Sequence, residues 1–296
     1  MIIPAYNAAQ CIDDALGSVV AQSYADWEVV VADDGSTDDT AARAAAADAR
    51  VRVVQTTGRL GPAGARNTAL AAATGELVAF LDADDLWLPD YLARQVGAFD
   101  RESAAPGPAV GIVACDAQVV TPSGVGSRTF LQQFRGYGDP ITLEAVLKQN
   151  RVYVSALVPR DAGEEVGWFE PMLFGTEDHD LWIRILETGR RAVLNLDVLA
   201  TYRHLPGSVS SHVARQATND QLTYRRALDR GRLDAHQRRI AESELRYHEV
   251  RTAVAEAWFE RSPGGLARQL PATASVVLRN PGRWRDWARV LAGVRV

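Results

Sequence analysis

Three things are scarce or absent in this 296-residue sequence, and each excludes a class of protein. The only cysteines, Cys11 and Cys115, lie far apart and form no metal-binding or redox motif, which fits a reduced, cytoplasmic compartment. There is no run of about 18 apolar residues, so we expect no membrane-spanning helix. Positive charge is not in excess, because the net charge is −5, and this argues against a general nucleic-acid-binding protein.

What remains is the composition of a globular protein with a large core, since 47% of the residues are hydrophobic and 23% are charged. In the first hundred residues, short apolar runs alternate with helical patterns, which is typical of a doubly wound α/β sheet with a nucleotide-type crevice. The first strand, which ends at Pro4, is so short that we expect it to be frayed, or the natural chain to start upstream. The expected strands are 1–3, 27–32, 51–54 and 77–81, and the expected helices are 8–22, one through 67–73, and 89–101.

The later sequence predicts an α/β half followed by helices. From 121 to 139 the chain is rich in Gly and Ser, so we expect a mobile loop over the site. Beyond residue 213 the pattern is helical, with breaks at Gly231 and 262–265. Further strands are expected at 110–120, 152–158 and 192–202, and helices at 141–149 and 177–186.

The run Leu77–Leu81 reads as a buried strand, central and parallel, that ends in acidic residues. Asp82 and Asp84 lie two residues apart, so on an extended backbone their side chains point the same way. Two carboxylates on one side suit Mg²⁺ or Mn²⁺, with a phosphate completing the coordination. The alternative is that Asp84 or Asp85 only caps the helix that begins near Pro89.

Six groups of residues between positions 1 and 211 stand out as motifs. They are Pro4-Ala5-Tyr6-Asn7, Asp33-Asp34-Gly35-Ser36-Thr37-Asp38, Gly61-Pro62-Ala63-Gly64-Ala65-Arg66-Asn67, Leu81-Asp82-Ala83-Asp84-Asp85, Glu177-Asp178 with Asp180-Leu181-Trp182, and Tyr202-Arg203-His204 with Gly207-Ser208. No single one is specific, but together and in this order they resemble the family 2 inverting glycosyltransferases with the GT-A fold. The resemblance implies a doubly wound mixed sheet with a Rossmann-like nucleotide-binding half; it covers residues 1–211, and the helical tail lies beyond it.

The resemblance implies a role for each of these stretches. Asp178 would be the general base that takes the proton of the acceptor hydroxyl, with Glu177 on the acceptor side. Asp84 and His204 would hold Mg²⁺ or Mn²⁺, which neutralises charge on the departing diphosphate. The nucleotide sugar would be bound by Pro4, Ala5, Tyr6, Asn7, Asp33, Asp34, Arg66, Asp82, Ala83 and Asp84, with Arg66 near the base or diphosphate and Asp82 on the ribose.

Most of these residues also have a structural alternative. Asp33 and Asp34 can simply shape a turn, and the acids at 177–178 can simply complement a helix dipole. Arg66 can pair with a neighbouring acid, and His204 can be an ordinary surface residue beside a turn.

The function that follows is transfer of a sugar from a nucleoside-diphosphate sugar to a glycan or lipid-linked glycan, as in polysaccharide or cell-envelope biosynthesis. Two alternatives stay open. A sugar nucleotidyltransferase would carry a Gly-rich, basic loop where this chain has Pro4–Asn7. A non-catalytic sugar-nucleotide-binding protein could lose the base, but Asp178 is present. We expect a nucleotide-sugar half at 1–103, an acceptor half at 104–211 and a helical extension at 212–296.

The tail has a charge opposite to that of the whole chain. Residues 261–296 hold seven arginines and a single acid, Asp286, and apolar residues recur at helical spacing. A basic amphipathic helix of this kind can lie on an anionic membrane surface. We therefore expect a peripheral contact with the inner face of the cell membrane, or else packing of this helix on the catalytic domain.

Overall fold

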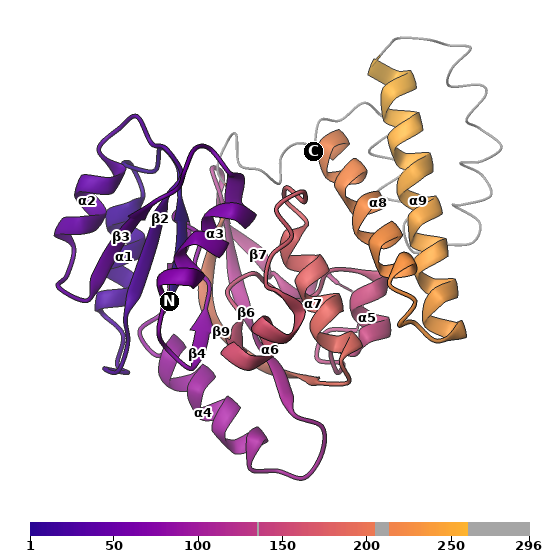
Figure 1. Ribbon diagram of the computed structural model, residues 1–296, viewed down its shortest axis with the longest axis horizontal. Coiled ribbons are helices and arrows are strands. Elements are labelled where there is room, and N and C mark those ends of the chain that lie inside the picture. The colour runs from indigo at the N-terminus through magenta and orange to yellow at the C-terminus, as the bar shows by residue number, and fades with distance from the viewer. Residues whose placement is uncertain (135, 205–212, 260–296) are drawn as a thin grey trace. The chain divides into compact units, whose positions relative to one another are not determined.

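A computed structural model describes residues 1–134, 136–204 and 213–259 of the chain (Figure 1). The chain divides into two compact units, Met1–Pro206 and Gly207–Val296. In the part that the structure describes, no helix combines the length and hydrophobicity needed to cross a membrane. The expected basic helix at 261–296 and the motif residues Gly207 and Ser208 lie outside the described residues, and the predicted boundaries at 103 and 211 stay predictions.

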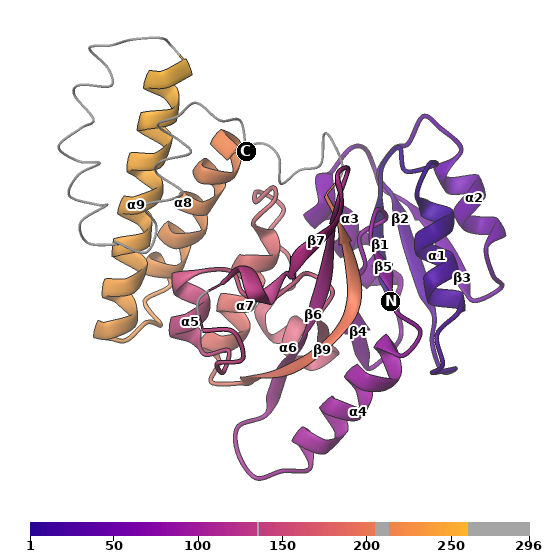
Figure 2. The ribbon, with the colours of Figure 1, turned by 180° about the vertical axis from the view of Figure 1, so that it is seen from behind.

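The chain begins with a parallel three-stranded sheet in the order β1-β2-β3. β1 pairs with β2 along its whole length, from Ile2 opposite Val30 to Ala5 opposite Asp33, so the expected fraying is not observed. Helices α1 and α2 cover one face of this sheet and α3 covers the other (Figures 1 and 2). The strands are β1 (Ile2–Ala5), β2 (Val29–Asp33) and β3 (Val51–Gln55), and the helices are α1 (Ile12–Val20), α2 (Thr40–Ala46) and α3 (Gly61–Ala72).

A second, six-stranded sheet follows, in the order β4-β8-β6-β9-β5, with β7 paired to β6. Its two longest strands, β6 and β9, run parallel, and its other pairs are antiparallel. The sheet is therefore mixed, as GT-A resemblance implied. Its strands are β4 (Leu77–Ala79), β5 (Leu86–Trp87), β6 (Val110–Thr121), β7 (Gly124–Thr129), β8 (Leu157–Pro159) and β9 (Arg191–Arg203).

Two sequence predictions for this sheet are wrong in detail. Much of the expected loop at 121–139 is the hairpin strand β7 and a short 3₁₀ turn, Leu131–Gln133, because the outer edge of β6 needs a hydrogen-bonding partner. The strand expected at 152–158 is reduced to β8, since the preceding residues form bends.

The two sheets meet between β1 and β4. A single parallel bridge joins Ile2 to Phe80, and the amide of Leu81 donates to the carbonyl of Ile2 at 3.1 Å. β4 itself pairs antiparallel with β8, so the prediction of a central parallel strand holds only at this bridge. The chain runs outward from β1 to β3 and then returns to the other side of β1. The carboxyl ends of β1 and β4 thus flank a topological switch point, the usual ligand-binding place in such sheets.

Four more helices complete the first unit. α7 begins at its acids, as predicted, and buries Leu181, Trp182 and Ile185 completely. α4 is preceded by Asp90 rather than by Asp84 or Asp85, so the helix-capping alternative for these acids is not observed. The helices are α4 (Tyr91–Ser103), α5 (Leu143–Lys148), α6 (Arg160–Val166) and α7 (Glu177–Glu187).

In the second unit the described residues form two packed helices, α8 (Val213–Asp229) and α9 (Ala235–Phe259). The break predicted at Gly231 is confirmed, since this residue has a φ of 66° in the turn between them. Tyr224 and Tyr247 are buried, and His248 Nδ1 lies 3.2 Å from a carboxylate oxygen of Asp220.

Candidate active site

The loops that follow β1 and β2 and precede α3 form one side of the site, which we name the donor rim (residues 4–7, 33–37 and 56–61). Asn7 adopts a φ of 48°, in the left-handed region that asparagine enters more readily than most residues other than glycine. Its amide N–H donates to Ser36 Oγ at 2.9 Å, and its side-chain oxygen accepts from the amide of Thr37 at 2.8 Å. Asn7 therefore fastens the first loop of the rim to the second.

Asp34 fastens the second loop to the third. Its carboxylate accepts the amides of Leu60 at 2.7 Å and Gly61 at 2.8 Å, and the hydroxyl of Thr56 at 3.0 Å. It thus binds the amide with which α3 begins, where a negative charge is favourable. Asp34 thus shapes the loop, and its predicted contact with the nucleotide sugar stays a prediction.

Asp33 and Tyr6 are more available on the rim than Asp34. Asp33 accepts one long bond, from the amide of Ser36 to Oδ1 at 3.3 Å, and in the described part of the chain its Oδ2 has no partner. The ring of Tyr6 is 39% exposed, and the guanidinium of Arg59 lies 3.8 Å above it. Both residues lie at the carboxyl ends of neighbouring strands, Tyr6 just after β1 and Asp33 at the end of β2. Pro4 and Ala5 contribute backbone at the end of β1.

The acidic centre faces the rim from the other side of the switch point; we use this name for Asp82, Asp84, Asp85, Glu177 and Asp178. One carboxylate oxygen from each of Asp82, Asp84 and Asp85 lies within 4.8 Å of the other two. They converge because residues 82–85 form a turn, closed by the amide of Asp85 and the carbonyl of Asp82 at 3.0 Å. The predicted strand alternation is wrong, since β4 ends at Ala79.

The crowding of these acids changes their protonation. Burial and the charge of Asp82 raise the pKa of Asp84 to about 6, and burial with both neighbouring acids raises the pKa of Asp85 well above its ordinary value. Close, repelling carboxylate oxygens are the donor set that Mg²⁺ and Mn²⁺ prefer, and a cation would relieve this repulsion. The residues present therefore fit a divalent cation. The imidazole of His204 is not part of this group in the described chain, and its role as a ligand stays a prediction.

Arg66 connects the two groups of acids. It is 3% exposed, and its guanidinium donates to Asp82 Oδ1 at 2.5 Å and to Glu177 Oε1 at 2.6 Å. The pairing with neighbouring acids that the sequence left open as an alternative is observed, and the place of Arg66 near the base or diphosphate stays a prediction. The partners are far apart in sequence, so no local pattern could have identified them.

Asp178 lies at the start of α7, partly exposed, and accepts the side-chain amide of Asn150 at 3.0 Å. Burial, and next the charge of Glu177, raise the pKa of Asp178 to about 7, although Arg66 opposes this shift. The helix start alone predicts an easily ionised acid. In the folded protein the opposite effects prevail, and the carboxyl group titrates near neutrality.

Four residues around the site were not predicted as functional: Arg59, Asn150, Tyr153 and Arg203. Tyr153 donates its hydroxyl to Asp85, and Arg203 bonds to both Asp84 and Asp85. Arg203 stands inside the motif that ends in His204, which was a usable signal. Arg59, Asn150 and Tyr153 belong to no motif and reach their partners only in the folded chain.

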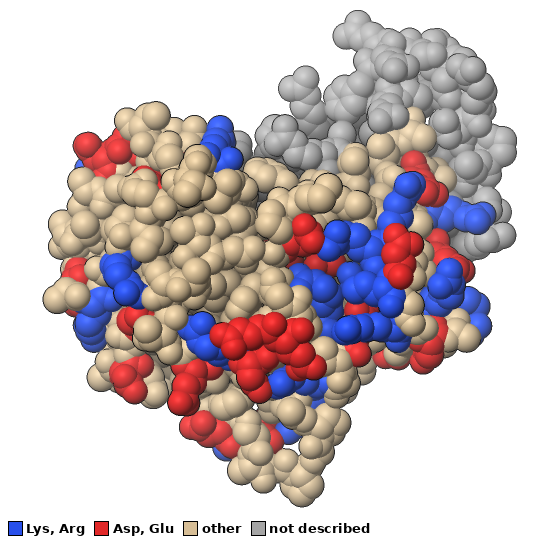
Figure 3. All heavy atoms as spheres, in the orientation of Figure 1, with Lys and Arg blue, Asp and Glu red and all other residues tan. Residues whose placement is uncertain are grey.

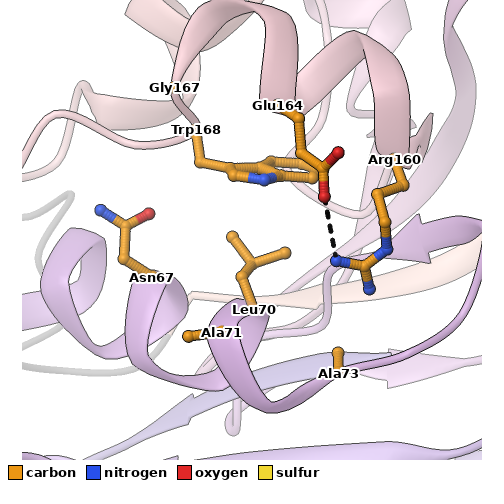
Figure 4. A pocket seen from close by; sticks show the side chains of 8 residues that line it. All are labelled: Asn67, Leu70, Ala71, Ala73, Arg160, Glu164, Gly167 and Trp168. Carbon is orange, nitrogen blue, oxygen red and sulfur yellow. Dashed lines mark ion pairs between the residues drawn. The ribbon is translucent and has the colours of Figure 1, made fainter.

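A shallow pocket of about 350 Å³ lies elsewhere, between α3 and α6 (Figure 4). Leu70 and Trp168 line it, and Arg160 pairs with Glu164 at 3.6 Å across its edge. Figure 3 shows acidic side chains gathered over α6, where Asp161 and its neighbours are exposed. The pocket contains no member of the acidic centre, so it is not the active site.

Solved structures share this fold. A mannosyltransferase from Pyrobaculum calidifontis, in complex with GDP-Man and Mn²⁺, has a TM-score of 0.66 and 26% identity, covering 98% of this chain and 83% of that one. Residues 1–349 of S. aureus TarS, in complex with UDP-GlcNAc, have a TM-score of 0.70 and 20% identity, covering 93% and 79%. The chain therefore has the GT-A fold.

The sequence comparisons give the family. The pattern described as Glycosyl transferase family 2 matches residues 1–137. TuaG of Bacillus subtilis, named as a teichuronic acid biosynthesis glycosyltransferase, is 32% identical over 231 residues, 76% of this chain and 86% of that protein. The succinoglycan biosynthesis protein ExoO of Rhizobium meliloti is 31% identical over 245 residues, 77% and 68%. The chain belongs to glycosyltransferase family 2. It is a glycosyltransferase, so the nucleotidyltransferase and the non-catalytic binding protein are both set aside.

Proposed function

We propose that this enzyme transfers a sugar from a nucleoside-diphosphate sugar to a hydroxyl of a glycan or lipid-linked glycan, with inversion at the anomeric carbon and with a divalent cation. The observation that carries the proposal is the acidic centre. One group of its acids converges on a turn beside the donor rim, and Arg66 ties that group to the helix start that holds Asp178.

The donor rim would hold the nucleoside. The exposed ring of Tyr6 offers a surface for stacking, and the free oxygen of Asp33 can accept an N–H of the base. Asn7 and Asp34 keep these loops in place. The ligands named in the two solved structures, UDP-GlcNAc and GDP-Man, support a nucleoside-diphosphate sugar as the donor class.

Asp84 and Asp82 would hold Mg²⁺ or Mn²⁺, with His204 as a further ligand. When bound, such a cation supplies positive charge beside the leaving diphosphate. Asp85 is less available, because Tyr153 and Arg203 already bond to its two oxygens. The Mn²⁺ named in the mannosyltransferase complex supports this assignment.

Asp178 would act as the general base. It takes the proton of the acceptor hydroxyl as that oxygen attacks the anomeric carbon, and the bond to the diphosphate breaks in the same displacement. One displacement inverts the anomeric centre. A pKa of about 7 suits a base that works near neutral pH.

The acceptor class is supported by the names of relatives. WfgD of Escherichia coli is named as a UDP-Glc:alpha-D-GlcNAc-diphosphoundecaprenol beta-1,3-glucosyltransferase and is 28% identical over 215 residues, 72% of this chain and 79% of that protein. A lipid-linked glycan is therefore our proposed acceptor for this enzyme, in the synthesis of a cell-envelope polysaccharide.

The donor and the cation can be tested together by thermal shift with UDP, GDP and dTDP, each with Mn²⁺ or with EDTA. A ligand that binds only the native state raises stability by RT ln(1 + [L]/Kd), so the correct base should stand out. Asp84→Asn should keep its fold and lose the Mn²⁺-dependent part of the shift. The control is Asp100→Asn, an exposed acid on α4.

Full Mn²⁺-dependent stabilisation of Asp84→Asn would contradict the cation assignment. Inversion is tested separately, from the anomeric coupling constant of the product by NMR: an α-linked donor should give a β-linked product.

A further inference from the structure

The turn that carries the acidic centre is fastened to the end of β9 through one residue. The amide of Arg203 donates to Asp85 Oδ1 at 2.8 Å, and its guanidinium Nε donates to the backbone carbonyl of Asp84. Two bonds from one residue therefore reach two consecutive residues of the turn. The first bond holds the Asp85 side chain, and the second holds the backbone carbonyl of Asp84.

Asp85 anchors this connection and is ill suited to bind a substrate. It is 1% exposed, and its other oxygen accepts the hydroxyl of Tyr153, which is itself 3% exposed. Both carboxylate oxygens are thus engaged inside the protein. Asp84, in contrast, is held only through its backbone carbonyl by this group of bonds, so its carboxylate is left facing Asp82.

The guanidinium of Arg203 also reaches α1. Its Nη1 lies 3.0 Å from Asp14 Oδ2, and the Arg203 side chain is 18% exposed. Arg203 therefore links β9, the acidic turn and α1 while it places one positive charge beside three crowded carboxylates. A planar guanidinium can serve two acceptors in different directions, which a lysine ammonium at the same place cannot do with the same geometry.

We propose that Arg203 is a positioning residue for the cation site: it fixes the backbone of the acidic turn so that the Asp84 carboxylate is held beside Asp82, without itself touching the substrate. The inference rests on the proposed function, because it assumes that this turn binds a divalent cation together with the donor. Residues that orient metal ligands typically contribute about 10–100-fold in metal affinity.

The test measures Mn²⁺ affinity directly, by the EPR signal of free Mn²⁺, in the presence of UDP or GDP, whichever stabilises the wild-type protein. Arg203→Gln should bind Mn²⁺ about 10–100-fold more weakly. Its affinity for the nucleotide in EDTA, measured by calorimetry, should be unchanged. Arg203→Lys should lie between Arg203→Gln and the wild type, since it keeps the charge but loses one of the two acceptors.

The matched control is Arg191→Gln, at the opposite end of the same strand. The guanidinium of Arg191 also bonds to backbone carbonyls, those of Glu102 at 2.6 Å and Pro108 at 3.0 Å, and to the Glu102 carboxylate at 2.7 Å. Its loss should lower the melting temperature and leave Mn²⁺ affinity as in the wild type. Tyr153→Phe, which removes only the hydroxyl from Asp85, is the variant to measure if Arg203→Gln does not fold, and it should weaken Mn²⁺ binding in the same sense.

Several outcomes would overturn the inference. These are wild-type Mn²⁺ affinity in Arg203→Gln, equal losses in Arg203→Gln and Arg191→Gln, or an equal loss of nucleotide affinity with Mn²⁺ and in EDTA. If the wild-type protein itself binds neither nucleotide in an Mn²⁺-dependent way, the proposed cation fails first and this inference fails with it.

Discussion

The donor rim and the acidic centre both depend on aspartates but treat their charges in opposite ways. On the rim, the Asp34 carboxylate accepts hydrogen bonds from two backbone amides and a hydroxyl, so groups of the protein itself compensate its charge. At the centre, burial and neighbouring acids raise the pKa values of Asp84 to about 6 and of Asp178 to about 7. The protein itself compensates the charge of Asp34 on the rim, whereas repulsion between neighbouring acids remains at the centre.

Whether the charge of a carboxylate is compensated distinguishes structural acids from proposed catalytic or metal-binding acids better than burial does. Asp34 and Asp85 are both buried, at 3% and 1% exposure, yet Asp34 organises loops, whereas the pKa of Asp85 is raised by burial and by the acids beside it. A carboxylate whose charge is left uncompensated costs stability, and such costs are concentrated where a protein works. The comparison can be tested by changing one acid on each side.

The largest effect is expected from Asp178→Asn, on the side of the centre. The variant cannot take a proton, so turnover should fall about a hundredfold or more while donor affinity stays nearly unchanged. Steady-state kinetics and calorimetry with the donor measure the two quantities. Glu187→Gln, at the other end of α7, is the control and should behave as the wild type. A collapse of donor affinity in Asp178→Asn would make this residue a binding residue and place the base elsewhere.

The next effect is the pH dependence of the rate. A base must be ionised, and a carboxyl group loses its charge as pH falls through its pKa. Since the pKa of Asp178 is raised to about 7, kcat/KM should level off above that value. Below it, the rate should fall about tenfold per pH unit.

Glu177→Gln tests whether Asp178 is the group that controls this pH dependence. Removing the neighbouring charge should lower the pKa of Asp178, so the acid limb should move to lower pH. A limb that stays in place in this variant would mean that another group controls the rate.

A smaller effect is expected on the rim, from Asp34→Asn. The side-chain amide offers a donor where the carboxylate accepted two amides, so one buried N–H is left unpaired, at a cost of about 1–3 kcal/mol. We expect a lower free energy of unfolding, measured by urea titration, and weaker binding of the nucleotide sugar at unchanged kcat. Asp48→Asn, which also alters a carboxylate that accepts a backbone amide, should affect stability only. A fall in kcat for Asp34→Asn would show that the rim takes part in the chemistry.

The sequence predicted what is local and missed what is long-range. The acids of the centre, the alternation of strands and helices and the start of α7 are all visible in short windows of sequence. The prediction that Asp82 and Asp84 point the same way from an extended strand is wrong, because the sequence does not show where β4 ends. The strand stops at Ala79, and a turn brings the two carboxylates together. The pairing of Arg66 with Glu177 joins residues 111 positions apart, and that of Arg203 with Asp85 spans 118. No periodicity carries such information.

The same limit explains the loop expected at 121–139. Gly and Ser weaken any strand prediction, but the open edge of β6 supplies hydrogen-bonding partners that only the folded sheet can offer. The site residues recognised through the family motif were recognised as a group, whereas Tyr153 and Asn150 belong to no motif and enter the site only by folding.

The junction of the two sheets has a consequence for how the molecule opens. The backbone crosses from β1 to β4 with a single bridge, Ile2 to Phe80, while each sheet satisfies its own ladder on either side. Cohesion across this line therefore comes from side chains, namely the apolar core that holds Ile3 together with Leu81, and the buried pairs of Arg66. We therefore expect amide hydrogen exchange to show separate opening on the two sides of this line. A nucleotide sugar bound across this line would couple the opening of the two sides.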